Sequence, residues 1–253
     1  MGTALGFGVD IGGSGIKGCP VDLDAGILAE ERLRLPTPQP STPDAVADAV
    51  AEIVEKFGWR GPVGITLPCV IKQGTAHTAA NVDKAWIGTD AQSLFAERLG
   101  LPRSEVAVLN DADAAGLAEM RTGAGVGRSG LVVLLTFGTG IGSATFVDGK
   151  LVPNTEFGHI EVDGHDAETQ AAASVKDDLD LSYPEWAPRV SRYLRALENF
   201  LWPDLIIAGG GVSKKAQKWL PLLESRTPVV AAELKNDAGI VGAATAATRG
   251  FEH

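Results

Sequence analysis

Hydrophobic and polar residues alternate along the first 35 residues, and short clusters rich in glycine and aspartate interrupt the alternation. A period of two is typical of half-buried β-strands, and such clusters are typical of turns. The apolar runs cover residues 4–9, 16–22 and 27–35. They predict a three-stranded meander whose first strand delivers Asp10 at its carboxyl end, with turns at residues 12–15 and 24–26.

Further along the chain, helical and strand-like spacing follow one another. Thr42 and Pro43 suit the N-cap and the first position of a helix, and Gly58 is a stop signal. Other helices are predicted at residues 91–99, 112–120, 186–200 and 239–247. Short apolar runs predict strands at residues 63–66, 106–109, 131–137, 144–147, 150–152 and 205–208.

A strand, a glycine turn and a second strand occur twice, first within residues 4–22 and again within residues 131–147. This duplication suggests two lobes that face each other across a cleft. The expected domains are a small amino-terminal lobe of residues 1–109 and a larger lobe of residues 110–238. The carboxyl-terminal helix, residues 239–253, is expected to pack back onto the first lobe.

Composition excludes several classes of protein. With 45% hydrophobic and 21% charged residues, the 253-residue chain has an ordinary globular composition. No apolar run approaches the roughly 18 residues of a membrane span, and the amino terminus lacks the basic and apolar regions of a signal peptide. A net charge of −10 argues against a general nucleic-acid surface, but it allows a local basic groove for a polyanion.

The two cysteines, Cys19 and Cys69, lie in apolar surroundings. They cannot by themselves build a disulfide framework or a thiolate zinc site. Two buried thiols in a reducing cytosol are expected. The sequence therefore predicts a cytoplasmic protein that does not span a membrane.

The first glycine turn formally matches a dinucleotide-binding fingerprint, Gly13-x-Gly15-x-x-Gly18. That fingerprint requires its last glycine to lie in a helix, and Pro20 would interrupt such a helix. A Walker A loop is also excluded, because no Gly-Lys-Ser/Thr sequence occurs. What remains is a hairpin whose backbone N–H groups can approach phosphate oxygens, with a purely structural tight turn as the alternative.

Candidate phosphate-binding residues lie in three such turns. Beside the backbone N–H groups of these turns, hydroxyl groups can supply further hydrogen-bond donors, and Lys17 can supply a positive charge. The third turn begins a predicted helix that carries Lys214, Lys215 and Lys218, which form either part of a polyanion track or a solvated helix face. The candidates are Gly12, Gly13, Ser14, Gly15, Ile16 and Lys17 in the first turn, Thr136, Gly138, Thr139 and Gly140 in the second, and Gly210, Gly211 and Ser213 in the third.

Two carboxylates stand at the ends of predicted strands. Asp111 follows a buried strand and precedes a helix, where it is either an N-cap or, if Asp113 is the cap, a free catalytic base. Transfer of a phosphoryl group to a hydroxyl needs such a base. Asp10 can hold Mg²⁺ through water, because Mg²⁺ prefers one or two carboxylates together with phosphate oxygens; the alternative for Asp10 is a turn-capping role.

A dense polar cluster begins at Glu156 and includes His159 and Glu161. A histidine flanked by two acids is a candidate for binding vicinal hydroxyl groups. A metal site formed by His159, His165 and the nearby acids is the alternative, although the spacing fits no standard zinc pattern.

Taken in order, these segments resemble the ROK family of sugar kinases over almost the whole chain. The resemblance is carried by residues 10–17, Leu67-Pro68, Asn81 with Trp86, and residues 110–115, 138–142, 156–159, 209–213 and 239–244. It implies an actin-like (ribonuclease H-like) α/β fold with two lobes and an interlobe cleft. It also implies that Asp111 is the catalytic base and that Asn81, Asn110, Glu156, His159 and Glu168 contact a hexose.

The stretch after His159 departs from many members of that family. Their Gly-His motif is followed by cysteines that bind zinc with the histidine, whereas residues 160–168 contain none. Structural zinc is therefore not expected, and His159 should be available to the sugar. This stretch, the GGSGIKG loop and residues 235–242 are similar to the polyphosphate glucokinase and polyphosphate/ATP glucomannokinase branch.

The expected function is transfer of a phosphoryl group to the 6-hydroxyl of glucose from polyphosphate, with ATP as a further donor and Mg²⁺ as cofactor. Family members are commonly homodimers, and a homodimer is expected here. The alternatives are an ATP-dependent kinase for mannose or N-acetylhexosamine and a non-catalytic sugar sensor. The family's repressors begin with a helix-turn-helix, whereas this chain begins with the first strand.

Overall fold

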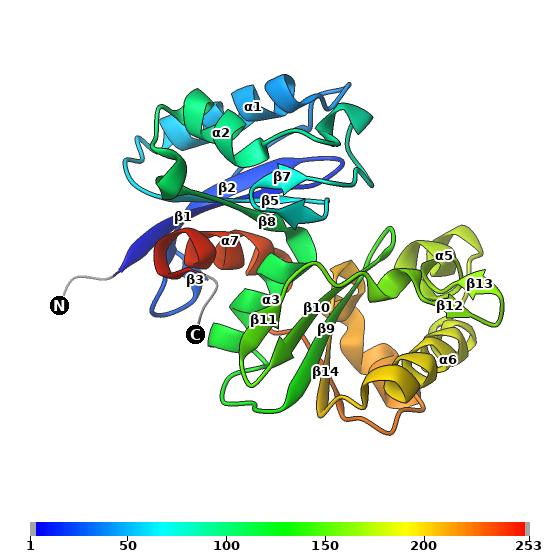
Figure 1. Ribbon diagram of the computed structural model, residues 1–253. Helices are drawn as coiled ribbons and strands as arrows, with labels where there is room; N and C mark the ends of the chain where they lie inside the picture. Colours follow the sequence, from blue (N-terminus) through cyan, green and yellow to red (C-terminus); the bar gives the residue numbers. More distant parts are fainter. Residues whose placement is uncertain (1–3, 251–253) are drawn as a thin grey trace. The chain divides into compact units, whose positions relative to one another are not determined.

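The computed structural model describes residues 4–250 and divides into two compact units (Figure 1). The first unit contains the chain up to Ala118 together with the segment that begins at Asp237, and the second contains Glu119–Asn236. The division falls between Ala118 and Glu119, inside a helix, rather than after residue 109.

The first unit is built on a mixed sheet with strand order β3-β2-β1-β5-β8, and β4 also pairs with β2. β1 is antiparallel to β2, whereas β5 is parallel to both β1 and β8. A separate small hairpin pairs β6 with β7. The strands are β1 (Leu5–Ile11), β2 (Ile16–Asp22), β3 (Ile27–Leu28), β4 (Leu33–Leu35), β5 (Val63–Leu67), β6 (Ile71–Lys72), β7 (Thr75–Ala76) and β8 (Val106–Asn110).

The third strand of the predicted meander is divided into β3 and β4. The charged residues Glu30, Glu31 and Arg32 separate the two short strands. In this segment the Cys19 thiol donates to the Glu30 carbonyl oxygen at 3.0 Å, and the Arg32 side chain pairs with the Asp237 carboxylate. Val21 pairs with Leu28 and Gly18 with Leu33, so residues 29–32 lie opposite only Cys19 and Pro20, and Pro20 has no N–H to donate. The prediction of one continuous strand over residues 27–35 is therefore wrong.

Helices cover both faces of this sheet, α1 and α2 on one face and α7 on the other (Figure 1). The approach of α7 is close, because a Cβ added at Gly8 or Gly64 would overlap a carbonyl oxygen of α7. Glycine at both positions lets helix and sheet backbones touch. The helical segments are α1 (Pro43–Lys56), η1 (Lys84–Trp86), α2 (Ala91–Leu99), η2 (Arg103–Glu105), α3 (Asp111–Thr122), which continues into the second unit, and α7 (Ala238–Arg249).

The second unit repeats the strand arrangement of the first, with order β11-β10-β9-β14-β15. β9, β10 and β11 are antiparallel neighbours, whereas β14 is parallel to β9 and β15. The duplicated module predicted from the two glycine turns is therefore confirmed at the level of sheet topology. The strands are β9 (Leu131–Phe137), β10 (Ile141–Val147), β11 (Lys150–Val152), β12 (Glu161–Val162), β13 (His165–Asp166), β14 (Leu205–Gly209) and β15 (Val229–Ala231).

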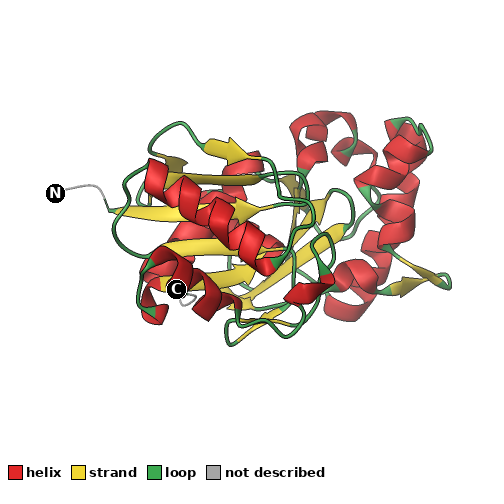
Figure 2. Ribbon diagram, turned by 90° about the horizontal axis from the view of Figure 1, so that it is seen from above, coloured by secondary structure: helices red, strands yellow, loops and turns green. Residues whose placement is uncertain are grey.

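The long helix of the second unit packs on this sheet through an aromatic cluster. Trp186 lies 5.0 Å from Trp219 and 5.9 Å from Phe137, measured between ring centroids. The helix begins earlier than predicted, because Ser182 and Glu185 form a capping box. Helix α4 packs against both α6 and α5. Figure 1 labels α5 and α6 at its right, and Figure 2 draws all helices in red. The helical segments are η3 (Phe157–His159), α4 (Glu168–Ala171), α5 (Ala173–Asp178), α6 (Tyr183–Leu201), η4 (Gly211–Lys218), η5 (Leu220–Leu222) and η6 (Lys235–Asp237).

Candidate active site

The first glycine turn is a tight hairpin between β1 and β2. Gly12 N–H donates to the Gly15 carbonyl oxygen at 3.0 Å, and the Thr37 hydroxyl donates to the Gly12 carbonyl oxygen at 2.5 Å. Arg34 Nη2 donates to the Ser14 carbonyl oxygen at 3.0 Å. Arg34 therefore places a guanidinium beside the candidate phosphate loop. It was not among the candidate residues, because its position depends on the pairing of β4 with β2.

Asp10 lies at the end of β1, between a lysine and a hydroxyl. Lys17 Nζ lies 3.3 Å from Asp10 Oδ2, and the Thr66 hydroxyl donates to Asp10 Oδ1 at 3.0 Å. Each carboxylate oxygen has a further lone pair, so Asp10 can still accept a hydrogen bond from a metal-bound water. The site is therefore compatible with water-mediated Mg²⁺.

Asn81 lies beside the first glycine turn. A Cβ added at Gly13 would lie 3.3 Å from the Asn81 carbonyl oxygen and 3.4 Å from its Cβ. Asn81 is exposed. Gly13, predicted to bind phosphate, and Asn81, predicted to bind sugar, are thus neighbours within one unit, although they are 68 positions apart in the sequence.

Asn110 and Asp111 form the junction between β8 and α3. Asn110 Oδ1 accepts hydrogen bonds from Ala112 N–H at 2.8 Å and Asp113 N–H at 3.2 Å, and its Nδ2 donates to the Cys69 carbonyl oxygen at 3.2 Å. Asn110 therefore caps the helix, and the expectation that Asp111 or Asp113 is the cap needs correction. Asp111 is exposed, and its Oδ1 accepts a hydrogen bond from Ala112 N–H at 2.9 Å.

The second glycine turn joins β9 and β10 and is supported from α5. Gly138 N–H donates to the Gly140 carbonyl oxygen at 2.9 Å. Ser174 donates through its N–H to the Gly138 carbonyl oxygen at 3.0 Å and through its hydroxyl to the Thr139 carbonyl oxygen at 2.7 Å. A Cβ at Gly138 would meet no atom of the described chain within 4 Å, so one side of the turn is open. Thr136 pairs with Gly142 across the hairpin, and Thr139 is exposed.

The third glycine turn differs from its prediction. Gly210 has φ +81°, and the buried Ser213 hydroxyl donates back to the Gly210 carbonyl oxygen at 2.8 Å. The following segment, η4, is a 3₁₀ helix interrupted at Lys215 by non-helical backbone angles. The predicted helix is thus a kinked 3₁₀ segment, and its lysines, Lys214, Lys215 and Lys218, are exposed.

His159, Asp166 and Glu168 converge in the second unit. His159 Nδ1 lies 2.9 Å from Asp166 Oδ2 and 3.9 Å from Glu168 Oε1. Glu168 Oε2 accepts a hydrogen bond from Ile141 N–H at 3.0 Å, next to the second glycine turn. Within residues 4–250, this is the group of histidine and acidic side chains whose ligand atoms all lie within 4.8 Å of one another.

The surrounding charges shift the pKa values of this cluster. The hydrogen bond that His159 donates to Asp166 is the largest cause that raises the pKa of His159; burial opposes it, and the charges of Glu168, Asp166 and Glu156 add to it. Burial also raises the pKa of Glu156, with His159 lowering it and Glu168 raising it. These mutual effects indicate that Glu156 lies close to the same cluster.

Local sequence explains why His159 is held in place. A Cβ at Gly158 would overlap the Ile141 carbonyl oxygen, so glycine is required between Phe157 and His159. Phe157 N–H donates to the Ser143 hydroxyl at 3.0 Å, and the Tyr193 hydroxyl donates to the Phe157 carbonyl oxygen at 3.1 Å. Strand β10 and helix α6 therefore fix η3 from two sides.

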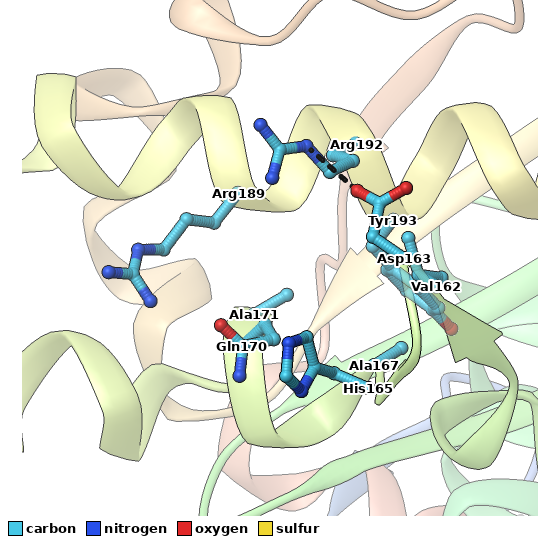
Figure 3. A pocket seen from close by; sticks show the side chains of 9 residues that line it. All are labelled: Val162, Asp163, His165, Ala167, Gln170, Ala171, Arg189, Arg192 and Tyr193. Carbon is cyan, nitrogen blue, oxygen red and sulfur yellow. Dashed lines mark ion pairs between the residues drawn. The ribbon is translucent and has the colours of Figure 1, made fainter.

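The neighbouring His165 faces a different environment. It lines a cavity of about 270 Å³ together with Arg189, Arg192 and the buried Tyr193 ring (Figure 3). Arg192 pairs with Asp163 across the rim of this cavity at 3.5 Å. Alternate residues of a strand point to opposite faces, which separates His165 from Asp166. The metal alternative that combined His159 with His165 is not supported by this arrangement.

Among residues 4–250, we find no helix with the length and apolar character needed to traverse a lipid bilayer.

Comparison with known proteins identifies similar chains. The model of the ROK family matches residues 6–176. Polyphosphate glucokinase from Mycobacterium tuberculosis is 61% identical over 248 residues, which cover 98% of this chain and 93% of that protein. Polyphosphate glucokinase from Mycobacterium leprae is also 61% identical, over 98% of this chain and 76% of that protein.

Solved structures of sugar kinases are also similar to this chain. The inorganic polyphosphate/ATP-glucomannokinase from Arthrobacter sp. strain KM superimposes with a TM-score of 0.91 and 53% identity, covering 96% of this chain and 98% of that one. A ROK family glucokinase from Streptomyces griseus, in complex with glucose and AMPPNP, has a TM-score of 0.79 and 28% identity over 95% and 98% of the two chains.

Proposed function

Because this chain belongs to the ROK family, we propose that it phosphorylates the 6-hydroxyl of glucose with inorganic polyphosphate as donor and ATP as an alternative donor. The predicted actin-like α/β fold is confirmed by the similarity to the ROK glucokinase and glucomannokinase structures. The observation that carries the proposal is 61% identity to a polyphosphate glucokinase over nearly the whole chain. The glycine turns and the cluster of His159, Asp166 and Glu168 support it.

Asp111 is the proposed catalytic base. Its carboxylate takes the proton of the glucose 6-hydroxyl as the oxygen bonds to phosphorus, and the bonding electrons of the broken P–O bond leave with the shortened phosphate chain. Asp111 is the first residue of α3 and is exposed, with Asn110 fixing the start of that helix. The base is thus mounted on a capped helix rather than on a loose loop.

The proposed hexose contacts are Asn81, Asn110, Glu156, His159 and Glu168. Carboxylates accept hydrogen bonds from sugar hydroxyls, and amide groups can both donate and accept. Asn110 already bonds to the backbone of Cys69 and to the first turn of α3 after Asp111, so its proposed role combines sugar contact with support of the base. The raised pKa of Glu156 follows from burial, as expected of a carboxylate in a ligand site.

The donor is proposed to lie against the glycine turns, with Mg²⁺ held through water by Asp10. Mg²⁺ would neutralise charge that develops on the transferred phosphoryl group. Backbone N–H groups and hydroxyls of the turns bind phosphate oxygens in this proposal, and Lys17 adds a positive charge. The residues are Gly12, Gly13, Ser14, Gly15, Ile16, Lys17, Thr136, Gly138, Thr139, Gly140, Gly210, Gly211 and Ser213.

Steady-state assays with separate donors test the proposal. We expect glucose 6-phosphate to form with long-chain polyphosphate and Mg²⁺, and more slowly with ATP. Failure of polyphosphate to support turnover while ATP does would overturn the donor assignment. Failure of both donors would overturn the enzyme assignment and favour a sugar sensor.

Mannose is the second proposed substrate, because the Arthrobacter relative is named a glucomannokinase. Comparison of kcat/KM for glucose, mannose and N-acetylglucosamine tests it. We expect glucose first, mannose second and N-acetylglucosamine far below both. We further propose a cytoplasmic homodimer, and light scattering during size-exclusion chromatography measures the mass of the assembly.

A further inference from the structure

The carboxylate of Asp166 connects two of the proposed hexose contacts. Asp166 Oδ2 lies 2.9 Å from His159 Nδ1, and Asp166 Oδ1 accepts a hydrogen bond from Glu168 N–H at 3.2 Å. The Asp166 carbonyl oxygen also accepts the Thr169 hydroxyl at 2.6 Å. A single residue at the end of β13 therefore holds an imidazole ring on one side and the start of α4 on the other.

The connection continues to the second glycine turn. Glu168 Oε2 accepts a hydrogen bond from Ile141 N–H at 3.0 Å, and a Cβ at Gly140 would overlap that carboxylate oxygen. Ile141 is the first residue of β10, directly after the turn. His159, Asp166, Glu168 and Ile141 thus form one chain of contacts inside the second unit.

We propose that Asp166 is a positioning residue that fixes the tautomer and orientation of His159 and the placement of Glu168 for hexose binding; this inference rests on the proposed function. An ionised carboxylate can only accept, so the proton of this hydrogen bond belongs to Nδ1. In the neutral imidazole, Nε2 then remains an acceptor for a sugar hydroxyl.

Other charged groups cannot replace Asp166 in this role. Glu168 Oε1 lies 3.9 Å from His159 Nδ1, beyond hydrogen-bond distance, and Glu156 acts on His159 through its charge. His165 lines the cavity at α6. Removing the Asp166 carboxylate should therefore free the ring.

The first test observes the imidazole directly in the ligand-free enzyme. Asp166→Asn keeps the size of the side chain and can still accept the Glu168 N–H bond, but it removes the charge. ¹⁵N–¹H NMR of the histidine rings, with His159→Gln for assignment, should show Nδ1-protonated His159 in the wild type. In D166N we expect a mixture of tautomers and a lower pKa of His159. An unchanged tautomer and pKa would overturn the inference.

The second test measures steady-state kinetics with polyphosphate. Loss of a carboxylate that orients a metal-binding histidine typically costs about 10- to 100-fold, and we expect an effect of similar size for a histidine that binds a hexose. We expect D166N to raise KM for glucose at least about tenfold, with kcat changed less than about threefold and KM for polyphosphate unchanged. Asp163→Asn is the matched control, because Asp163 lies in the same hairpin and pairs with Arg192 rather than with His159.

The outcomes separate this inference from the proposed function. If H159Q raises KM for glucose but D166N changes neither KM nor the NMR signal, the positioning role is wrong and the hexose contact stands. If H159Q leaves KM for glucose unchanged, the hexose contact is wrong, and the inference falls with it. Circular dichroism of D166N verifies that the variant is folded.

Discussion

Gly242 lies directly against the backbone of Ala114, so a Cβ added at Gly242 would overlap the Ala114 carbonyl carbon and oxygen. Gly242 is in α7, and Ala114 is in the first turns of α3, the helix that begins at Asp111. The contact ties the carboxyl-terminal helix to the helix that carries the proposed base. It also explains why residues 110–118 belong to the first unit.

Gly242→Ala should therefore destabilise the protein. Glycine to alanine inside a helix normally gains up to about 1 kcal/mol, whereas forced overpacking typically costs about 1–3 kcal/mol. We expect a net loss of up to about 2 kcal/mol in the free energy of unfolding, measured by urea denaturation. Thr248→Ala, at an exposed position of α7, should change it by less than about 0.5 kcal/mol. A G242A protein as stable as the wild type would contradict the packing argument.

Asp111→Asn should abolish turnover and spare glucose binding. Asn keeps an oxygen that can accept the Ala112 N–H bond, so the start of α3 is preserved while the base is lost. We expect kcat to fall about 10²- to 10⁴-fold and the glucose Kd, measured by calorimetry, to change less than a few-fold. Asp177→Asn, at an exposed position of α5, is the control. A D111N enzyme that keeps more than about 1% of kcat would refute the base assignment.

Arg34→Gln should weaken binding of the phosphoryl donor. The variant loses the bond to the Ser14 carbonyl oxygen and the guanidinium that packs against Gly15. Because charged hydrogen bonds are about twice as strong as neutral ones, we expect KM for polyphosphate to rise about tenfold, with KM for glucose unchanged. Arg60→Gln, in an exposed loop, is the matched control. An equal rise in both KM values would indicate general damage to the first unit instead.

The sequence predicts most elements because their signals are local. Helix α2 has the predicted bounds, since an aspartate cap precedes it and Gly100, with φ +64°, ends it. The strands before the glycine turns are equally clear, because apolar runs end at turn residues. The division of residues 27–35 into two strands could not be predicted, because it depends on the register in which both segments pair with β2.

Two further signals in the sequence indicate elements of the second unit. Ser182 and Glu185 have the spacing of a capping box, and the helix begins there. Asp163-Gly164 is a typical two-residue hairpin turn, and both residues have positive φ. Recognising that hairpin would have paired Val162 with His165 and placed Asp166 on the side opposite to His165. The bond between Asp166 and His159 itself requires the folded structure.

Replacement of Lys214, Lys215 and Lys218 by glutamine tests whether these three lysines bind the polyphosphate chain. All three side chains are exposed on η4. If they attract the polyanion, KM for long-chain polyphosphate should rise about tenfold and become less sensitive to salt, while KM for ATP changes less than about twofold. The control is a second triple variant in which Lys56, Lys72 and Lys150 are replaced by glutamine, so that the same number of positive charges is removed away from η4. Equal effects of the two triple variants would show that only net charge matters.

Glu198 should make the stability of the second unit depend on pH in the acidic range. Its buried Oε1 accepts hydrogen bonds from Thr227 N–H and the Ser225 hydroxyl, both at 2.7 Å. Burial alone would raise the pKa of Glu198, but the hydrogen bonds from Thr227, Ser225 and Arg226 outweigh it and hold the pKa below its usual value. The carboxylate therefore stabilises the fold above the ordinary glutamate pKa of about 4.3, and this contribution is lost as the pH falls through the lower folded-state pKa.

Glu198→Gln should reduce the free energy of unfolding by about 2 kcal/mol at pH 7, because hydrogen bonds to an ionised group are lost. The difference between variant and wild type should shrink as the pH is lowered below about 4. Urea denaturation across this pH range measures it. Glu224→Gln removes an exposed carboxylate paired with Arg195, and it should cost less than about 1 kcal/mol at any pH. A deficit in E198Q that stays constant with pH would mean that the shape of the side chain, rather than its charge, holds the loop before β15.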